Sequence, residues 1–301
     1  MLQKKKLVAA LVDRGRKKRE KERAFLENGG LVLEKLVSSC NGRPIPIRTF
    51  SYEWVMSATS KYDDSLIIRR EWMYTFYKGS FEGRNVSIRS YSPNYIYNEK
   101  SMDFALTDIG MSAKMSAHKN ILKIIGCCLE TSIPTLVYEY AENGVLARRI
   151  FISLRQGTFI EWQSRLKIAR ETAHAIAYLH TAFSRPIIHM GVKLANIFLD
   201  QYDVPKLTHF TFSVSIPEGE THVVLDELCG TTGFLCPHVM RTRTVTEKID
   251  VYSFEGGGAG IEQQLQAMLQ LALTCLEDSP EIRPTMVDVT KELRQIERLV
   301  A

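Results

Sequence analysis

The chain has 301 residues, of which 45% are hydrophobic and 24% are charged, so its composition is that of an ordinary globular protein with a sizeable core. It contains no apolar run of membrane-spanning length, no cleavable signal sequence, no C-x-x-C spacing among its six cysteines and no metal-ligand cluster among its seven histidines. These patterns exclude a membrane-embedded protein, a disulfide-stabilised secreted domain and a zinc protein, and they predict a cytoplasmic chain.

The positive charge is concentrated at the N-terminus. The net charge is +5, but residues 1–23 hold ten Lys or Arg against three acidic residues, which is +7, so the rest of the chain carries −2. Apolar residues at helical spacing predict a basic helix over residues 1–26. Three roles are open for it: packing lightly on the domain, contacting an anionic membrane, or contacting nucleic acid. Leu2 excludes N-myristoylation, which requires Gly there.

Turn and strand signals organise the middle of the chain. Asn28-Gly29-Gly30 predicts a turn, and residues 50–58 predict a capped helix. A β-hairpin is expected over residues 67–79, followed by a strand over residues 85–90. Further predicted elements are two buried strands at 121–129 and 135–140, a turn at Asn143-Gly144 and a strongly periodic helix at 162–180.

The most informative stretch is residues 186–212. It contains His189-Met190-Gly191, then Lys193 and Asn196, then an apolar strand, a turn, a second strand and His209-Phe210-Thr211. This pattern resembles the catalytic loop and magnesium loop of protein kinases, in which His-Arg-Asp is followed by Lys, Asn and Asp-Phe-Gly. Gly230, Asp250 and Arg283 stand at further positions of the same pattern.

The resemblance covers about residues 50–300. It implies an α+β, two-lobed protein-kinase-like fold with a truncated C-terminal lobe. The chain would consist of a basic arm with a juxtamembrane-like segment (1–49), a kinase-like N-lobe (50–140) and a kinase-like C-lobe (141–301).

The C-lobe departs from the kinase pattern after Phe254. The predicted central helix ends in a glycine-rich run, residues 255–260, and a new helix begins near Ile261. Several dozen residues, including nearly all of the central helix and the substrate-docking helix, are missing relative to the family. Either the surrounding helices collapse inward, or the sequence is a splice or gene-model variant that folds poorly. His238 also replaces the Glu that pairs with Arg283 in kinases, so we expect Arg283 to lack a carboxylate partner.

The resemblance implies that the groups for phosphoryl transfer are lost. Gly191 occupies the position of the catalytic Asp and cannot accept the substrate proton. His209 occupies the position of the metal-binding Asp, although magnesium prefers oxygen ligands. Lys193 and Asn196 remain, and we interpret them as vestiges that hydrogen-bond the loop backbone. We expect no catalytic residue and no metal site.

The glycine positions of the kinase phosphate loop are also altered. They are filled by Arg69, Glu71 and Tyr74, so we predict a plain hairpin that does not fold over ATP.

Arg89 stands where the ATP-anchoring Lys would be, and it is not interchangeable with Lys. The position of the paired Glu falls at Ile109, next to Asp108, which could substitute imperfectly, and we expect the ion pair to be absent. No cofactor is expected beyond weak, metal-independent ATP binding. The weak candidates for it are Arg89, Glu139, Tyr140 and Asn196.

Among kinases, the chain resembles the plant ZED-type non-functional pseudokinases, which are relatives of receptor-like cytoplasmic kinases. The basic arm, Asn28-Gly29-Gly30, His118-Lys119-Asn120 and the degenerate catalytic loop carry this resemblance. The segment around residues 25–58 also resembles the juxtamembrane segment of wall-associated receptor kinases. The subfamily implies an adaptor that associates with a leucine-rich-repeat immune receptor of the nucleotide-binding class and with receptor-like cytoplasmic kinases.

Three functions remain open. The leading hypothesis is a catalytically inactive adaptor in plant innate immune signalling, cytoplasmic or peripheral at the plasma membrane through residues 1–23, with no nucleic-acid partner. The alternative is an atypical serine/threonine protein kinase with residual ATP binding and phosphoryl transfer. It would need Asp200 or Asp203 to reach the site from a turn expected to face away. In the third, the basic arm binds membrane or nucleic acid and the domain is only its carrier.

Overall fold

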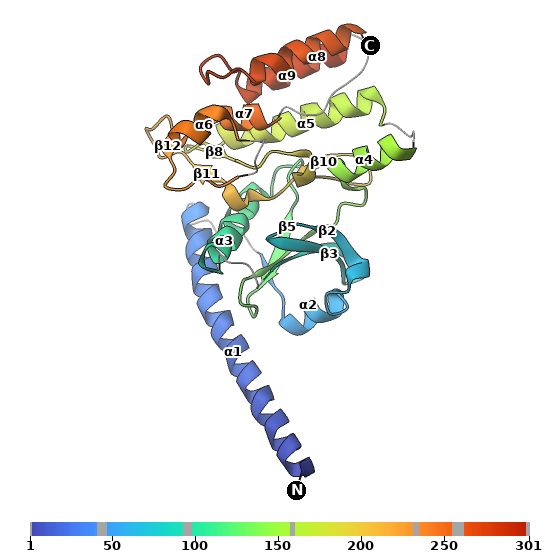
Figure 1. Ribbon diagram of the computed structural model, residues 1–301, viewed down its shortest axis with the longest axis vertical. Helices are drawn as coiled ribbons and strands as arrows, with labels where there is room; N and C mark the ends of the chain where they lie inside the picture. Colours follow the sequence, from blue (N-terminus) through green and yellow to red (C-terminus); the bar gives the residue numbers. More distant parts are fainter. Residues whose placement is uncertain are drawn as a thin grey trace. The chain divides into compact units, whose positions relative to one another are not determined.

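A computed structural model describes residues 2–40, 47–92, 98–156, 160–230, 235–254 and 262–298 (Figure 1). The chain divides into two compact units. The N-terminal unit comprises Met1–Lys114 and Ile124–Tyr140, and the C-terminal unit comprises Met115–Lys123 and Ala141–Ala301. The predicted basic arm therefore groups with the N-terminal unit, and residues 115–123 group with the C-terminal unit.

The N-terminal unit is built on a six-stranded sheet with the strand order β1-β5-β6-β4-β3-β2. Neighbouring strands are antiparallel except for β1 and β5, which are parallel. The strands are β1 (Arg48–Thr49), β2 (Ile67–Arg70), β3 (Tyr74–Phe81), β4 (Arg84–Tyr91), β5 (Ile124–Cys128) and β6 (Thr135–Glu139). The helices are α1 (Leu2–Ser39), α2 (Tyr52–Ala58), the 3-10 turn η1 (Asp64–Leu66) and α3 (Asn98–Met115).

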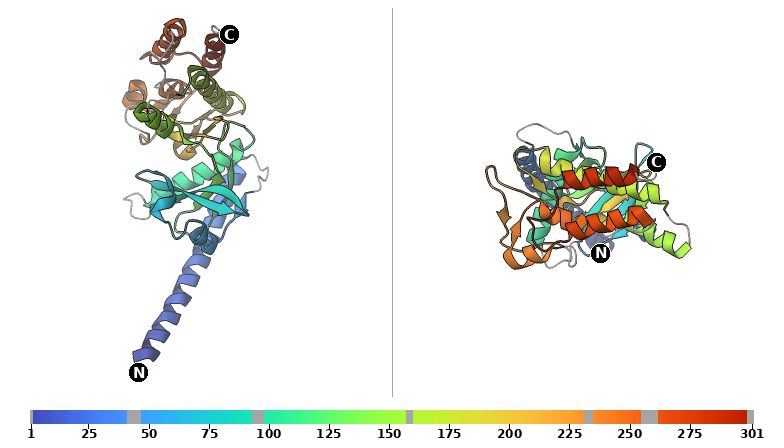
Figure 2. Two further views of the ribbon diagram at one scale, coloured as in Figure 1. Left: turned by 90° about the vertical axis from the view of Figure 1, so that its right-hand side faces the viewer. Right: turned by 90° about the horizontal axis from the view of Figure 1, so that it is seen from above.

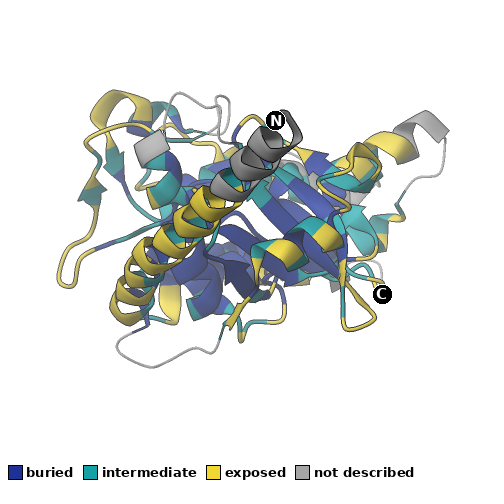
Figure 3. Ribbon diagram, turned by 90° about the horizontal axis from the view of Figure 1, so that it is seen from below, coloured by how far each residue is buried: buried dark blue, intermediate teal, exposed yellow. Residues whose placement is uncertain are grey.

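Alternation along β4 gives this sheet two different faces. Val86 and Ile88 lie on one face and pack with Phe50 and Val55 in a hydrophobic cluster next to α2. Arg89 lies on the opposite face, where α3 supplies its partner, Asp108. Residues on both faces of β4 are buried, from Val86 to Arg89, and Figure 3 shows buried residues in dark blue.

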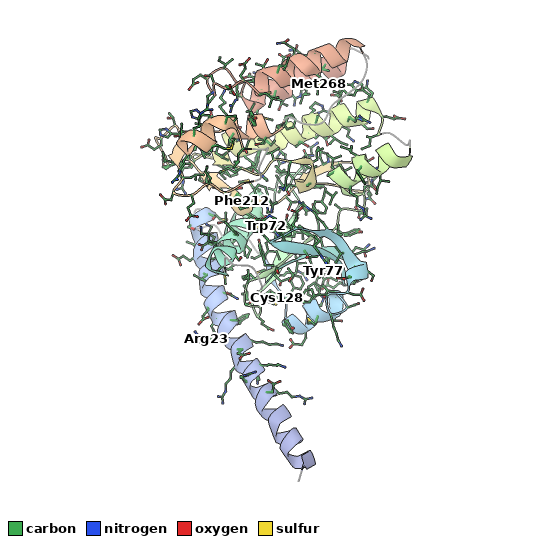
Figure 4. The ribbon with its side chains drawn as sticks, in the orientation of Figure 1. Arg23, Trp72, Tyr77, Cys128, Phe212 and Met268 are labelled. Atoms are coloured by element: carbon green, nitrogen blue, oxygen red, sulfur yellow. The ribbon has the colours of Figure 1, made fainter. Side chains whose placement is uncertain are left out.

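The predicted capped helix and hairpin are confirmed. Helix α2 begins after Ser51, whose side chain accepts a hydrogen bond from the backbone N–H of Trp54 at 3.2 Å. Strands β2 and β3 form an antiparallel hairpin, closed by a backbone hydrogen bond of 2.9 Å from Glu71 N to Tyr74 O. Trp72 lies at the tip of this hairpin and is half-exposed (Figure 4).

The predicted turn at Asn28-Gly29-Gly30 is wrong, because α1 continues through these residues to Ser39. Each glycine lowers the stability of a helix by about 1 kcal/mol relative to alanine. Packing offsets this cost: the Asn28 amide donates to the carbonyls of Leu129 and Thr131, both at 2.8 Å, and Val32 is buried one turn later. The sequence signal was local, whereas the contacts that override it come from residues about 100 positions away.

The C-terminal unit is mainly helical. Its long helix α5 buries an apolar face, and α9 packs along α5, with an ion pair of 2.7 Å between Arg170 and Glu297. Helices α8 and α9 lie side by side (Figures 1 and 2). The helices are α4 (Leu146–Gln156), α5 (Trp162–Thr181), α6 (Pro237–Thr242), α7 (Lys248–Phe254), α8 (Glu262–Cys275) and α9 (Met286–Arg298).

Short strands and 3-10 turns connect these helices. They form a three-stranded sheet of order β10-β9-β7 and the two-stranded pairs β8-β11 and β12-β13. The strands are β7 (Gly144–Val145), β8 (Ile187–Ile188), β9 (Ile197–Leu199), β10 (Pro205–Leu207), β11 (Val214–Ser215), β12 (Val223–Val224) and β13 (Thr244–Val245). The 3-10 turns are η2 (Leu194–Asn196) and η3 (Phe210–Phe212).

The predicted interruption of the C-lobe has a structural counterpart. Helix α7 has only seven residues, residues 255–261 lie outside the described part, and α8 begins at Glu262. Leu273 on α8 and Leu276, which directly follows α8, remain 53% and 41% exposed, as expected where a central helix no longer covers its neighbours.

Arg283 is stabilised without a carboxylate hydrogen-bond partner among the described residues. It is buried and donates to the carbonyls of Glu277 at 2.6 Å, Asp278 at 3.2 Å and Lys248 at 3.3 Å. Its guanidinium also lies 5.0 Å from the ring centre of Tyr252. Backbone oxygens therefore replace the carboxylate.

None of the helices in the described part of the chain combines the length and the apolar character that a membrane span requires.

Acidification should destabilise the C-terminal unit through His118, which lies 3.2 Å from His174. Burial, followed by the nearby His174 and Lys119, lowers the pKa of His118 from 6.5 to about 4. The unfolded chain therefore takes up a proton that the folded chain does not, and stability is lost as the pH falls from about 6.5 towards about 4.

Urea unfolding at about pH 7.5 and about pH 5 measures this loss. Because His118 is half-exposed, we expect His118→Gln to remove only about 1 kcal/mol of it. His222→Gln, on an exposed loop, is the control. An unchanged loss in His118→Gln would contradict the prediction.

Candidate functional site

A buried carboxylate, Asp250 of α7, anchors the catalytic loop (residues 189–196) through hydrogen bonds. Its two oxygens accept hydrogen bonds from the backbone N–H groups of His189 at 2.7 Å and Met190 at 2.9 Å. His180 of α5 donates to the same carboxylate at 2.9 Å. Met190 has a left-handed backbone with φ of 58°, a conformation that costs energy unless its surroundings enforce it. The hydrogen bond from Met190 N to Asp250 holds the backbone in this conformation.

His189 links the catalytic loop to the strands beside it. Its Nδ1 accepts a hydrogen bond of 3.1 Å from the backbone N–H of Gly191, so its Nε2 carries the proton and donates to the carbonyl of Thr208 at 3.1 Å. The ring also packs edge-on against Phe210, with 4.9 Å between ring centres. His189 is completely buried and acts as a structural crosslink.

Gly191 and Asn196 define the place where a kinase would keep its base. The Asn196 amide donates to the Gly191 carbonyl at 2.7 Å, as expected for a residue that supports the loop backbone. A Cβ added to Gly191 would meet Asn196 and His189 at 3.5 Å, which is ordinary van der Waals contact. The position could hold a side chain, so sterics do not require glycine here. Lys193 occupies the N-cap position of the 3-10 turn η2 at the end of the same loop, and its backbone carbonyl accepts a hydrogen bond of 2.8 Å from the backbone N–H of Asn196.

His209 takes the position of the metal-binding Asp, and its surroundings do not suit magnesium. It is buried, with a left-handed backbone (φ 73°, ψ 60°) and Nδ1 3.3 Å from the hydroxyl of Thr211. Its ring packs against Phe212, with 5.4 Å between centres. An imidazole in an aromatic environment does not supply the oxygen ligands that magnesium requires. The residues at this position therefore do not fit the ion that the kinase pattern implies.

The two acidic residues that could replace the lost base are used by the turn between β9 and β10. Asp200 accepts hydrogen bonds from the backbone N–H groups of Tyr202 at 2.9 Å and Val204 at 3.0 Å. Asp203 accepts from the Asn143 side chain at 2.7 Å. Each carboxylate therefore has a local structural role.

In the N-terminal unit, the expected absence of an ion pair is wrong. Arg89 pairs with Asp108 of α3, and both side chains are completely buried. Ser112 also donates to Asp108 at 2.9 Å. Burial opposes the charge of Arg89, but Asp108 and the neighbouring tyrosines outweigh it, so the pKa of Arg89 is raised. The sequence analysis placed the partner of Arg89 at Ile109, one residue away from Asp108, which forms the pair.

The residues at the three glycine positions interact with one another. Arg69 forms an ion pair with Glu71, with 2.9 Å between Nε and the carboxylate, and its guanidinium lies 5.9 Å from the ring centre of Tyr74. Tyr74 is 2% exposed. The hairpin therefore satisfies its own charged groups, in agreement with the prediction of a plain hairpin.

The two remaining candidate ligands lie at the end of β6. Glu139 is opposite Val86 of β4, and the Tyr140 ring lies 5.1 Å from the ammonium group of Lys78. The structure brings Arg89, Glu139 and Tyr140 into the N-terminal unit and Gly191, Lys193, Asn196 and His209 into the C-terminal unit.

Comparison with known proteins identifies the family. Residues 82–255, more than half of the chain, match the protein kinase domain. This chain belongs to the protein kinase family. The match ends directly after α7, where the predicted central helix is interrupted.

Its relatives include both kinases and pseudokinases of Arabidopsis thaliana. The chain is 36% identical to the serine/threonine-protein kinase ZRK1, over 94% of this chain and 95% of that protein. It is 36% identical to the non-functional pseudokinase ZRK2, with 94% of each chain covered. It is 44% identical to the non-functional pseudokinase ZED1, over 78% of this chain and 69% of ZED1. The predicted resemblance to ZED-type relatives is confirmed.

The alignment with ZRK1 also contains positions that have no counterpart in this chain. It runs over 332 positions, but 94% of 301 residues is about 283, so roughly 49 positions of ZRK1 have no counterpart here. This number is similar in size to the several dozen residues that the kinase pattern lacks.

The sequence interpretation missed two functional features. Asp108 was identified only as an imperfect substitute, although i, i+4 spacing to Ser112 marks one buried face of α3. Tyr74 was seen only as a lost glycine. The hairpin register could have placed its ring on the same sheet face as Arg89. Tyr74 and Phe76 are two residues apart and therefore point to the same face, and Phe76 lies opposite Arg89.

The buried pair should be essential for stability. We expect Asp108→Asn to lower the free energy of unfolding by about 3–5 kcal/mol, because it leaves the Arg89 charge buried without its counterion. Asp103→Asn, exposed on the same helix, should cost less than about 0.5 kcal/mol. Chemical denaturation measures both values. Equal, small effects would show that the pair does not stabilise the fold.

Proposed function

We propose that this protein is a catalytically inactive member of the kinase family that acts as a cytoplasmic adaptor in plant innate immune signalling. Its partners would be a leucine-rich-repeat immune receptor of the nucleotide-binding class and active receptor-like cytoplasmic kinases. The observation that carries the proposal is the intact catalytic loop around an empty base position: Asp250, His189 and Asn196 hold the loop, while Gly191 offers no side chain.

The mechanism of a kinase depends on positioned charge, and this chain has lost several parts of it. General-base catalysis contributes about 10²–10⁴ to the rate, and electrostatic stabilisation of the transferred phosphate contributes more. Here Gly191 replaces the base and His209 replaces the metal ligand. Two of the relatives, ZRK2 and ZED1, are named non-functional pseudokinases, which supports the proposal.

The alternative function is residual serine/threonine phosphorylation. It is favoured by the name of ZRK1, a serine/threonine-protein kinase that is as similar to this chain as ZRK2 is. The retained Arg89–Asp108 pair is compatible with it, because a Lys–Glu pair at this place belongs to the active state of kinases. However, a base would have to come from Asp200 or Asp203. Asp200 accepts hydrogen bonds within its own turn, and Asp203 accepts one from the Asn143 side chain.

A phosphorylation assay distinguishes the two functions. We expect the purified protein, given magnesium-ATP and a generic protein substrate, to transfer phosphate at least about 10⁴-fold more slowly than the 1–100 s⁻¹ typical of kinases. The same background should be seen for Asp200→Ala and for the exposed control Asp226→Ala. Transfer by the wild-type protein that disappears in Asp200→Ala alone would establish the alternative function.

Exposed apolar side chains on α1 support a protein-binding role. Leu26, Leu33 and Val37 are 73%, 63% and 53% exposed. Their spacing of seven and four residues places them on one helix face, opposite the face through which Asn28 and Val32 dock on the N-terminal unit. Large apolar residues that are exposed together are typical of protein interaction sites.

Substitution on this face tests the adaptor function. We expect Leu33→Glu to weaken binding to the leucine-rich-repeat receptor by at least about tenfold, since it places a charge in an apolar contact. Ser38→Glu, exposed on the same helix, is the matched control and should bind normally. Co-elution and calorimetry without ATP measure the interaction. The absence of a complex with both receptors and kinases would contradict the adaptor proposal.

A further inference from the structure

The side chains around Arg89 form a closed aromatic environment within the N-terminal unit. Strand register explains it. Tyr74 lies opposite Tyr91, and Phe76 lies opposite Arg89, so these four side chains share one face of the sheet. Tyr138 joins them from β6, where it lies opposite Ser87, two residues before Arg89.

The Arg89 guanidinium is enclosed on several sides. Its central carbon lies 3.9 Å from the ring centre of Tyr74, 4.9 Å from that of Tyr91 and 5.7 Å from that of Phe76. Asp108 binds it from α3. The result is a cation with no exposed surface, while Tyr74 and Tyr91 are only 2% and 6% exposed.

Tyr74 is the nearest of these rings, and it occupies the last of the three positions that are glycine in an ATP-binding hairpin. Glycine there leaves room for phosphate oxygens to approach the backbone and the basic side chain of the neighbouring strand. A tyrosine ring stacked on the guanidinium fills that room, because an aromatic face attracts a cation at this distance.

We propose that Tyr74 is a plug that keeps nucleotide phosphates away from Arg89. Arg89 would then be the cation of a latent polyanion site, and Tyr74 is the nearest of the three aromatic rings that cover it. The proposal deepens the proposed function: the protein would be inactive because it lacks the base and, independently, because its own side chain takes the place of the nucleotide. The hairpin is fixed in this closed form by the Arg69–Glu71 pair and by the hydrogen bond of 2.9 Å from Ser92 N to Met73 O.

Removing the ring tests the plug. Binding of ATP and of inorganic tripolyphosphate, both without magnesium, is measured by calorimetry on the full chain and on Tyr74→Gly, Tyr74→Leu and Tyr74→Phe. We expect the wild-type protein and Tyr74→Phe, which keeps the ring, to bind neither probe measurably. Tyr74→Gly and Tyr74→Leu should bind both probes at least about tenfold more tightly than the wild-type protein. Adding Arg89→Met to Tyr74→Gly should abolish the gain.

Circular dichroism identifies the variants that fold. A folded Tyr74→Gly or Tyr74→Leu protein that binds no better than the wild-type protein would overturn the proposal. If neither variant folds, the ring is an indispensable part of the core and not a removable plug, which would overturn it as well. These outcomes leave the proposed function intact, because that function fails only if the wild-type protein itself transfers phosphate or binds no partner.

Discussion

The N-terminal unit depends on a buried ion pair between Arg89 and Asp108. Neither charge is exposed, so each is tolerable only because the other is present, and the pair ties the central strand β4 to α3. In a kinase, the basic residue at this position also anchors ATP. Here the aromatic rings of Tyr74, Tyr91 and Phe76 surround Arg89, and its pairing with Asp108 stabilises the fold.

The C-terminal unit follows the same principle through Asp250. Its carboxylate binds two backbone N–H groups of the catalytic loop and the ring of His180, so the loop keeps its conformation without the residues that perform chemistry. Buried polar groups must be satisfied for the chain to fold, whereas a catalytic side chain such as the one missing at Gly191 is needed only for turnover. A kinase fold can therefore lose catalytic side chains and keep its shape, as the adaptor function that we propose requires.

The sequence predicted much of the fold because its signals were local. The capping residue Ser51, the alternation along β4 and the periodicity of α5 each correspond to an observed element. The failures came from distant contacts. Asn28 binds carbonyls about 100 residues away and carries α1 through two glycines, and Asp108 meets Arg89 only because α3 packs on the sheet. Composition likewise gave no sign that the ring of Tyr74 would stack on Arg89, since that contact depends on strand register.

Hydrogen–deuterium exchange of the purified chain, with and without magnesium-ATP, tests most directly the claim that a rigid kinase scaffold is closed to its nucleotide. We expect slow exchange at the amides of His189 and Met190, which are bound to Asp250, and along β4 around Arg89. Adding magnesium-ATP should leave both regions unchanged. Fast exchange in the catalytic loop, or new protection of β4 on adding nucleotide, would contradict this account.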